Sequence, residues 1–174
     1  MLILKYISKL IKILRSAASP NQIAGGFILG MVMGLTPFWS LHNLVIFIIV
    51  VILNVNFAMV IFSIIICSGF AYLFDPLFHD LGYYLLVDVK SLHGLWTSMY
   101  NIPIVALSKF NNTVVMGSFV SSIALMLPVF FLVKYGVIAY REKIDARIQK
   151  LKIVQAMKGS KLYGIYQKIR DWRD

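Results

Sequence analysis

The chain has 174 residues, of which 60% are hydrophobic, and a formal net charge of +10 at pH 7. Residues 16–74 contain no Asp, Glu, Lys or Arg, and no soluble domain of this size could use such a stretch as its surface. Because a charge at the centre of a bilayer costs roughly 2.5–3.5 kcal/mol on insertion scales, this composition indicates an integral membrane protein. The single cysteine, Cys67, excludes an internal disulfide and a thiolate metal site.

Residues 1–18 predict a basic amphipathic helix that lies in the membrane interface. Apolar side chains share one helical face: Ile3, Ile7, Leu10, Ile11 and Leu14. Lysines occupy the other face: Lys5, Lys9 and Lys12. A basic residue near an anionic leaflet contributes about 1 kcal/mol to membrane binding. We therefore expect these lysines, together with Arg147 and Lys150 near the other end of the chain, to contact anionic lipid.

Residues 19–74 predict a glycine-rich hairpin followed by the first membrane span. The apolar segments 24–35 and 44–53 are short for a span, which needs about 20 residues, whereas residues 57–74 are long enough. The uncharged turn at Pro37 favours a re-entrant helical hairpin, because a bilayer tolerates irregular backbone where protein buries it. Three tilted crossings are the alternative.

The remaining segments complete a polytopic all-α membrane protein with at least two true spans. Residues 75–112 are predicted to form an external-face interfacial segment, and residues 113–137 a second span. Residues 138–174 predict a basic amphipathic tail. Of the 17 Lys and Arg, only Lys90 and Lys109 lie between residue 15 and residue 134. The positive-inside rule then places both termini in the cytoplasm.

The external segment carries aromatic residues suited to a membrane–water interface. We expect two short helices here, over residues 76–87 and 91–101. Tyrosine and tryptophan bury an apolar ring while keeping a polar tip in water. The external aromatic surface is expected to contain Tyr83, Tyr84, Trp96 and Tyr100.

Three glycines recur every four residues ahead of a proline turn. Gly26, Gly30 and Gly34 therefore share one helical face, and Pro37 follows them. A face without Cβ atoms lets another helix approach closely. We interpret these residues as a packing surface, either within the chain or toward a partner or a second copy.

Polar residues flank the two short apolar segments. His42 and Asn43 precede the second of them, and Asn54 and Asn56 follow it. When buried, such groups need hydrogen-bond partners. We expect them to cap helices and to bond across the hairpin, and a polar rim around a cavity is the alternative.

The chain shows no sequence motif for catalysis or metal binding. The external segment holds His79 and His93 with Asp75 and Asp80, but their spacing matches no known metal site. It has no nucleophile elbow and no glycine-rich phosphate loop. We expect no enzymatic activity, no metal and no cofactor. Because topology explains the basic charge, we also expect no nucleic-acid partner.

One stretch of the chain resembles a known family. Residues 19–43 show a proline before an Ile-Ala pair, glycines four apart, a proline turn, a small residue and a polar pair. The matching residues are Pro20, Ile23, Ala24, Gly26, Gly30, Gly34, Pro37, Ser40, His42 and Asn43, followed by Asn56 and Gly82. This pattern resembles a widespread family of small bacterial integral membrane proteins, catalogued as a domain of unknown function, over residues 19–87. Where that family often has Asn-Pro, this chain has Cys67-Ser68.

The resemblance implies an inner-membrane protein of bacteria with two membranes, sometimes encoded beside a larger envelope protein. It implies no reaction. We therefore predict a non-catalytic inner-membrane subunit that docks a larger membrane-anchored periplasmic protein and assists lipid movement out of the inner membrane. The alternative is a small transporter or channel formed by a homo-oligomer. It is suggested by a faint internal repeat that aligns Pro37 with Pro128, but it lacks an intramembrane charged residue to bind an ion.

Overall fold

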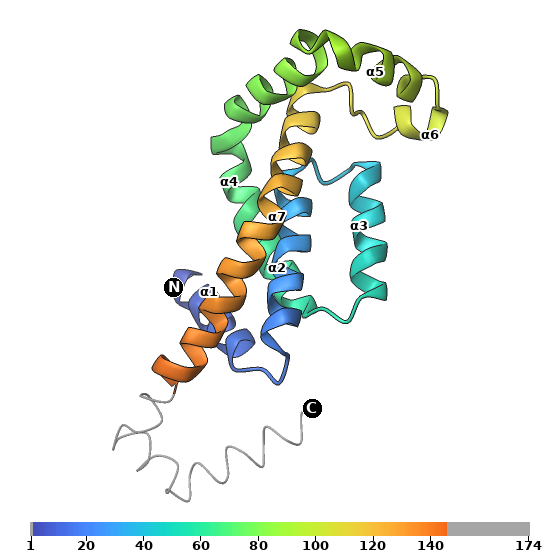
Figure 1. The fold of residues 1–174 in the computed structure, drawn as a ribbon. Coiled ribbons are helices and arrows are strands. Elements are labelled where there is room, and N and C mark those ends of the chain that lie inside the picture. Colours follow the sequence, from blue (N-terminus) through green and yellow to red (C-terminus); the bar gives the residue numbers. More distant parts are fainter. Residues whose placement is uncertain (1, 146–174) are drawn as a thin grey trace, which may run out of the picture. The chain divides into compact units, whose positions relative to one another are not determined.

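The computed structural model describes residues 2–145 and contains helices and connecting turns in that range, with no strand (Figure 1). The all-α prediction is therefore confirmed for the part of the chain that is described. The bounds of the α-helices are α1 Leu2–Leu14, α2 Pro20–Leu35, α3 Leu41–Ile52, α4 Phe57–Tyr83, α5 His93–Tyr100, α6 Pro103–Ala106 and α7 Thr113–Ala139. The chain divides into two compact units, Met1–Tyr135 and Gly136–Asp174. The described residues of the second unit form the end of α7 and a π-helix, Tyr140–Asp145.

Two helical stretches among the described residues are long and apolar enough to cross a membrane, namely Phe57–Asp88 and Thr113–Lys143. At a rise of about 1.5 Å per residue, the 27 residues of α4 extend about 40 Å, which exceeds the roughly 30 Å of a hydrocarbon core. The 16 residues of α2 and the 12 of α3 extend only about 24 and 18 Å. Neither shorter helix is long enough to cross the hydrocarbon core alone.

The ends of α2 follow from local sequence. The Gln22 N–H donates to Ser19 Oγ at 3.2 Å, and the Ser19 N–H donates to Gln22 Oε1 at 2.7 Å, which together form a capping box. Pro20 occupies the first turn, where its missing N–H costs nothing. At the other end Thr36 is extended, as expected for a residue that precedes a proline, here Pro37.

Helix α2 packs along α4 through its glycine face. A Cβ atom added at Gly26 would lie 2.6 Å from the carbonyl oxygen of Asn56, and one added at Gly34 would lie 2.8 Å from that of Ile64. Gly30, between them, faces α4 in the same way. Real Cβ atoms do not approach other atoms this closely, so only glycine permits the contact. Because each step of four along α2 matches a similar step along α4, the two helices run in the same direction.

Two hydrogen bonds join α2 and α4 beside this seam. The Asn56 N–H donates to the carbonyl oxygen of Gln22 at 3.0 Å, where α4 begins. About two turns further along α4, Ser63 Oγ donates to the carbonyl oxygen of Phe27 at 2.8 Å. Ser63 is fully buried, so its hydroxyl would be costly to leave without a partner.

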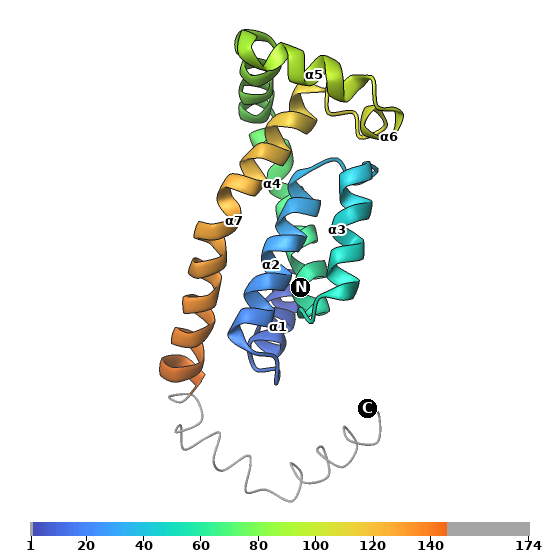
Figure 2. The same ribbon diagram turned by 45° about the vertical axis from the view of Figure 1, so that its right-hand side comes forward.

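Helix α3 returns the chain so that α2 and α4 can lie parallel. Figures 1 and 2 show α2 beside both α3 and α4. A buried cluster joins the three helices through Leu29, Val32 and Met33 of α2, Ile46 and Val50 of α3, and Val60 of α4. Phe119 and Met126 of α7 pack against this cluster. This apolar cluster and the glycine seam together hold α2 in the core of the first unit.

The helix expected over residues 76–87 does not begin at Pro76. Instead α4 continues through Pro76 to Tyr83, and a π-helix extends it over Tyr84–Asp88. Proline removes one hydrogen bond of the helix, a loss that long membrane helices tolerate. The second expected helix is observed as α5, preceded by a 3₁₀ turn over Lys90–Leu92.

A second glycine seam joins α4 to α7. A Cβ atom added at Gly82 would collide with the carbonyl oxygen of Thr113, and one added at Gly117 with that of Phe78. The residue numbers run in opposite directions along the two helices, so α4 and α7 are antiparallel here. His79 Nδ1 and Thr113 Oγ1 share a hydrogen bond of 2.7 Å beside this seam.

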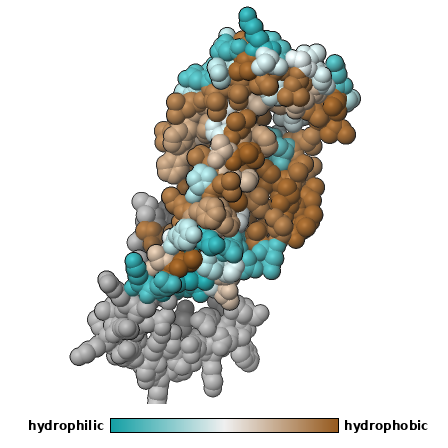
Figure 3. Space-filling model, viewed as in Figure 1, coloured by the Kyte–Doolittle hydropathy of each residue, from teal (hydrophilic) through white to brown (hydrophobic). Residues whose placement is uncertain are grey.

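The exterior of the first unit is strongly apolar. Figure 3 shows hydrophobic residues over most of the visible surface around the α2–α4 helices, whereas hydrophilic residues gather near α5 and again at the lower end of the coloured residues. The exposed apolar side chains of α3 and α4 include Leu44, Val51, Ile52, Leu73 and Leu77. An apolar surface of this extent marks contact with lipid or with a partner.

Candidate functional site

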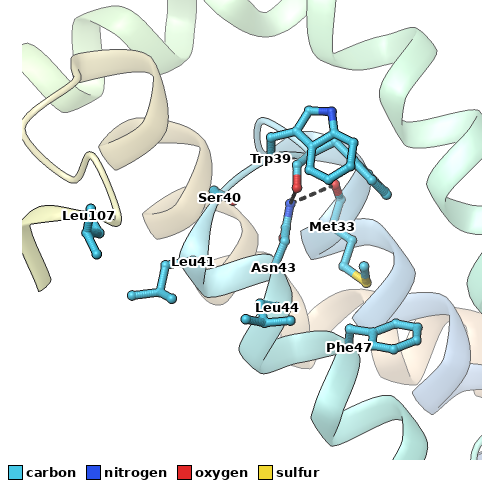
Figure 4. A pocket seen from close by; sticks show the side chains of 9 residues that line it. Met33, Trp39, Ser40, Leu41, Asn43, Leu44, Phe47 and Leu107 are labelled. Carbon is cyan, nitrogen blue, oxygen red and sulfur yellow. Dashed lines mark hydrogen bonds between the residues drawn. The ribbon is translucent and has the colours of Figure 1, made fainter. Parts of the chain in front are cut away.

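The turn between α2 and α3, residues 36–40, is held together by the side chain of Asn43. Its Nδ2 donates to the carbonyl oxygen of Pro37 at 3.0 Å and lies 3.4 and 3.5 Å from those of Phe38 and Met33, as Figure 4 shows in part. The hydroxyl of Thr36 lies 3.0 Å from Asn43 Oδ1 and 2.7 Å from the carbonyl oxygen of Val32. Both Thr36 and Asn43 are buried. The polar groups of the turn therefore satisfy one another.

His42 and Ser40 extend this network. Ser40 Oγ donates to the carbonyl oxygen of Pro37 at 2.8 Å and lies 2.9 Å from His42 Nε2. When the serine proton serves Pro37, the imidazole must be the donor in the second bond. The His42 ring also packs against Phe119 of α7, with ring centroids 5.1 Å apart. The hairpin tip is consequently a fixed structure and not a loose loop.

The four polar residues flanking the apolar segments do not form one rim. His42 and Asn43 lie at the hairpin tip, whereas Asn54 and Asn56 lie beyond the other end of α3, about 18 Å away along the helix. Asn56 caps α4, with its Oδ1 accepting from the Met59 N–H at 2.9 Å. Asn54 is exposed in a turn. Three of the four residues thus hold hydrogen bonds within the hairpin and its connections.

The aromatic pair at the tip opens onto a cleft that we call the tip cleft. Phe38 is 56% exposed and Trp39 is 89% exposed, and their rings meet edge to face at 5.4 Å. The cleft has a volume of about 480 Å³, which lies within the usual range for ligand pockets. Its lining is formed by Met33, Phe38, Trp39, Ser40, Leu41, Asn43, Leu44, Phe47 and Leu107 (Figure 4).

A second cleft, which we call the α5 cleft, is lined by His42 and has a volume of about 390 Å³. Trp96 of α5 forms part of its wall and donates from Nε1 to the carbonyl oxygen of Leu85 at 3.0 Å. The remaining lining comes from α5, α7 and the segment between them: Met99, Ser108, Phe110, Val115, Met116, Phe119 and Val120. The α5 cleft is therefore apolar apart from one imidazole, one indole N–H and one hydroxyl.

The external aromatic residues separate into two groups. Tyr83, Tyr84 and Tyr100 are exposed, as expected for a surface. Trp96 is half-buried and packs 6.1 Å from Phe110, so it belongs to the cleft wall. Three of the four expected residues are thus exposed, and Trp96 is the one that is half-buried.

A third cleft, which we call the α1 cleft, lies between α1 and α4 and holds about 390 Å³. Lys9, Lys12 and Ile13 line it from α1, and Ser16 lines it from the segment that follows α1. The α4 side contributes Asn56, Ala58, Ile61, Phe62 and Ile65. Of the other expected lipid-contacting residues, Arg147 and Lys150 lie outside the described residues, and the side chain of Lys5 is likewise outside the description.

No group of three or more His, Cys, Asp or Glu that could hold a metal ion occurs among residues 2–145. The two histidines of residues 75–112 have other partners: His79 bonds Thr113, and His93 Nε2 lies 3.0 Å from the carbonyl oxygen of Val87. These contacts orient the ends of α4 and α5.

Sequence reasoning missed several buried polar residues. Thr36 and Ser63 tie α2 to α3 and to α4, and Ser118 and Ser122 are fully buried on α7 next to Gly117. Small hydroxyl residues spaced four apart on an apolar helix are a packing signal of the same kind as the glycines. This spacing could have identified Ser118 and Ser122 as packing residues from sequence. The role of Thr36 could not be identified in this way, because it depends on the position that the fold gives to Asn43.

These arrangements have a common chemical character. Open clefts with carbon-lined walls and few hydrogen-bonding groups match acyl chains better than hydrated ions or sugars. The tip and α5 clefts contain no charged side chain among the residues that line them. Lysines line only the α1 cleft.

Comparison with known proteins shows what the chain is similar to. A family model described as "Uncharacterized protein conserved in bacteria (DUF2062)" matches residues 5–145, well beyond the stretch on which the resemblance was recognised. An uncharacterized protein from Treponema pallidum (strain Nichols) is 25% identical over 150 residues, which cover 86% of this chain and 92% of that protein. No solved structure matches the chain.

Proposed function

Since the chain belongs to this family of uncharacterized bacterial proteins, we propose that it is a non-catalytic inner-membrane subunit that helps lipid leave the membrane. In this role it would dock a larger membrane-anchored periplasmic protein. The observation that carries the proposal is the pair of apolar clefts beside the hairpin tip, which offer acyl chains a surface and offer a hydrophilic solute almost nothing.

The length of the hairpin supports this role. In the proposed topology both termini are cytoplasmic, α4 and α7 cross the bilayer, and α2 and α3 enter and leave on one side. Because α2 extends only about 24 Å, the hairpin would end inside the bilayer, with Phe38 and Trp39 near the expected external segment, whose Leu107 also lines the tip cleft. A bulky tip at that depth disturbs the packing of neighbouring lipid tails, and the tip cleft adjoins it.

The partner would bind a surface other than the glycine face of α2. The glycine face is covered by α4, so it is not available to another chain. The outer face of α3 is free in the described part of the structure, with Val51 68% and Ile52 75% exposed. A transmembrane helix of the partner would pack there by van der Waals contact.

The alternative function, a small oligomeric transporter or channel, finds less support. Ion binding or proton relay within a membrane usually uses a charged side chain, and residues 16–74 and 110–133 have none. The buried polar residues at the hairpin tip bond one another and leave no lined path. This alternative stands as an outcome of the test below.

The test uses a photocrosslinking amino acid at two exposed positions. Trp39 lines the tip cleft, whereas Tyr72 of α4 is 82% exposed and lines none of the three clefts. After purification of the full chain in mild detergent, loosely bound lipid is lost, so we expect phospholipid adducts at position 39 and few at position 72. Equal adducts at both positions would show that the tip cleft holds no retained lipid.

A second measurement addresses the partner and the alternative. Deletion of the protein should raise outer-membrane permeability, and crosslinking in cells from Val51 should capture a larger envelope protein. If Val51 captures only this chain, and purified protein carries ions or small solutes into liposomes, the channel function replaces the one proposed.

A further inference from the structure

We propose that the α1 cleft is a binding site for one anionic phospholipid, with the phosphate at Lys9 and Lys12 and an acyl chain against α4. The α4 wall consists of Ala58, Ile61, Phe62 and Ile65, which recur at helical spacing on one face. From Asn56 to Ile65 this wall extends about 13 Å, which is close to the roughly 15 Å of hydrocarbon in one leaflet. The opposite wall is α1, which brings both lysines to the cleft.

The two lysines have no carboxylate partner in the described structure. Residues 1–74 contain no Asp or Glu, and neither Lys9 nor Lys12 forms an ion pair within residues 2–145. The next carboxylate along α4 is Asp75, about 15 Å beyond Ile65. Both lysines are exposed, so their charges are available to a ligand at the cleft.

The other polar groups of the cleft are already engaged. Asn56 Oδ1 accepts from the Met59 N–H at 2.9 Å, and Ser16 Oγ donates to the carbonyl oxygen of Ile13 at 2.6 Å. The lysine ammonium groups are therefore the donors left for a phosphate. The N-terminus of α4, which begins beside Asn56, adds a partial positive charge of the same sign.

The lipid preference of the site follows from the separate roles of the apolar wall and the two lysines. An acyl chain that moves from bilayer to protein exchanges one apolar environment for another, so the apolar wall gives little net affinity. The phosphate provides the discrimination, because each basic residue near an anionic lipid changes its binding by about fivefold. The site should therefore prefer phosphatidylglycerol to phosphatidylcholine with the same tails.

This inference does not rest on the proposed function. The α1 cleft shares no lining residue with the tip cleft or the α5 cleft. Loss of lipid adducts at Trp39 would overturn the proposed function and would not affect this site. Failure of lipid binding at the α1 cleft would overturn this site and would not affect the proposed function.

The test is native mass spectrometry of the full chain with an equimolar mixture of phosphatidylglycerol and phosphatidylcholine. The variant Lys9→Gln/Lys12→Gln should lose most of the preference for phosphatidylglycerol, by about fivefold for each lysine. The matched control is Lys90→Gln/Lys109→Gln, which removes the same charge from exposed positions outside the cleft. An equal loss in both variants would mean general electrostatic attraction and would overturn the site.

A second pair of variants tests the cleft with its charges intact. Ala58→Trp fills the α4 wall, whereas Ala124→Trp adds the same bulk at an exposed position of α7 that lines none of the three clefts. Bound phosphatidylglycerol should fall in the first variant and persist in the second, with both proteins monodisperse by gel filtration. Unchanged binding in Ala58→Trp would show that the lipid lies elsewhere.

Discussion

Replacing Gly30 with alanine measures how closely α2 and α4 must approach. The added Cβ would lie 2.8 Å from Ser63 Cβ and nearer still to the carbonyl oxygen of Val60. Since carbon atoms pack at about 3.5–4.0 Å, α2 must move away from α4 by about half an ångström or more. That movement also stretches the 2.8 Å hydrogen bond from Ser63 Oγ to Phe27.

The magnitude follows from opposing terms. Overpacking of this kind costs about 1–3 kcal/mol, and a weakened hydrogen bond adds up to about 1 kcal/mol. Alanine improves helix propensity over glycine by about 1 kcal/mol. We therefore expect Gly30→Ala to lower the free energy of unfolding by about 1–2 kcal/mol, despite the better helix former.

The control is Gly69→Ala on α4, where an added Cβ meets nothing within 4 Å. This variant gains helix propensity alone and should be neutral or slightly more stable. Unfolding in mixed micelles of mild detergent and sodium dodecyl sulfate, followed by circular dichroism, compares the two. A larger contrast should separate Gly30→Leu from Gly94→Leu, because Gly94 also has open space around it. If Gly30→Ala resists detergent as well as Gly69→Ala does, the close-packed seam is refuted.

Two further predictions concern the hairpin tip and the topology. Asn43→Ala should lower the free energy of unfolding by about 1–3 kcal/mol, because buried carbonyl groups of the turn lose their donor. The control Asn54→Ala, at an exposed turn, should change this free energy little. Equal values for the two variants in the same detergent titration would exclude the hydrogen-bonding role of Asn43. In a Cys67→Ser background, cysteines at positions 91 and 160 should react with an impermeant thiol reagent from opposite sides of the membrane, and reaction from one side would contradict the topology.

The helical architecture was largely accessible from sequence because its signals are local. A stretch without charge predicts immersion in lipid, and glycines four apart predict a bare helical face. The bare glycine face is observed where α2 packs on α4, and α4 is long and apolar enough to cross a membrane. The path of α4 through Pro76 was not accessible, because a proline in an apolar segment is equally consistent with a helix end and with a helix that tolerates the lost bond. The packing of α4 on α7 around Gly82 decides between them.

The candidate site was less accessible, because its clefts arise from elements far apart in the chain. His42 and Trp96 share the α5 cleft although more than fifty residues separate them. The polar rim, which was the alternative interpretation of the four polar residues, does not form because α3 separates His42 and Asn43 from Asn56. Likewise the half-buried position of Trp96 depends on Leu85 and Phe110, which are 11 and 14 residues away along the chain. Periodicity describes one helix at a time and does not report these tertiary contacts.

The parallel pairing of α2 with α4 has a consequence for biogenesis. During translation α2 leaves the ribosome well before α4 is synthesised. Helix α2 is short and rich in glycine, and each glycine costs about 1 kcal/mol of helix stability relative to alanine. Until α4 follows, the α2–α3 hairpin lacks its main packing partner. We expect a nascent chain that ends before Asn56 to remain extractable at the insertion machinery, and release into the bilayer to begin once synthesis has passed Cys67. The order of synthesis would then time the insertion of the hairpin.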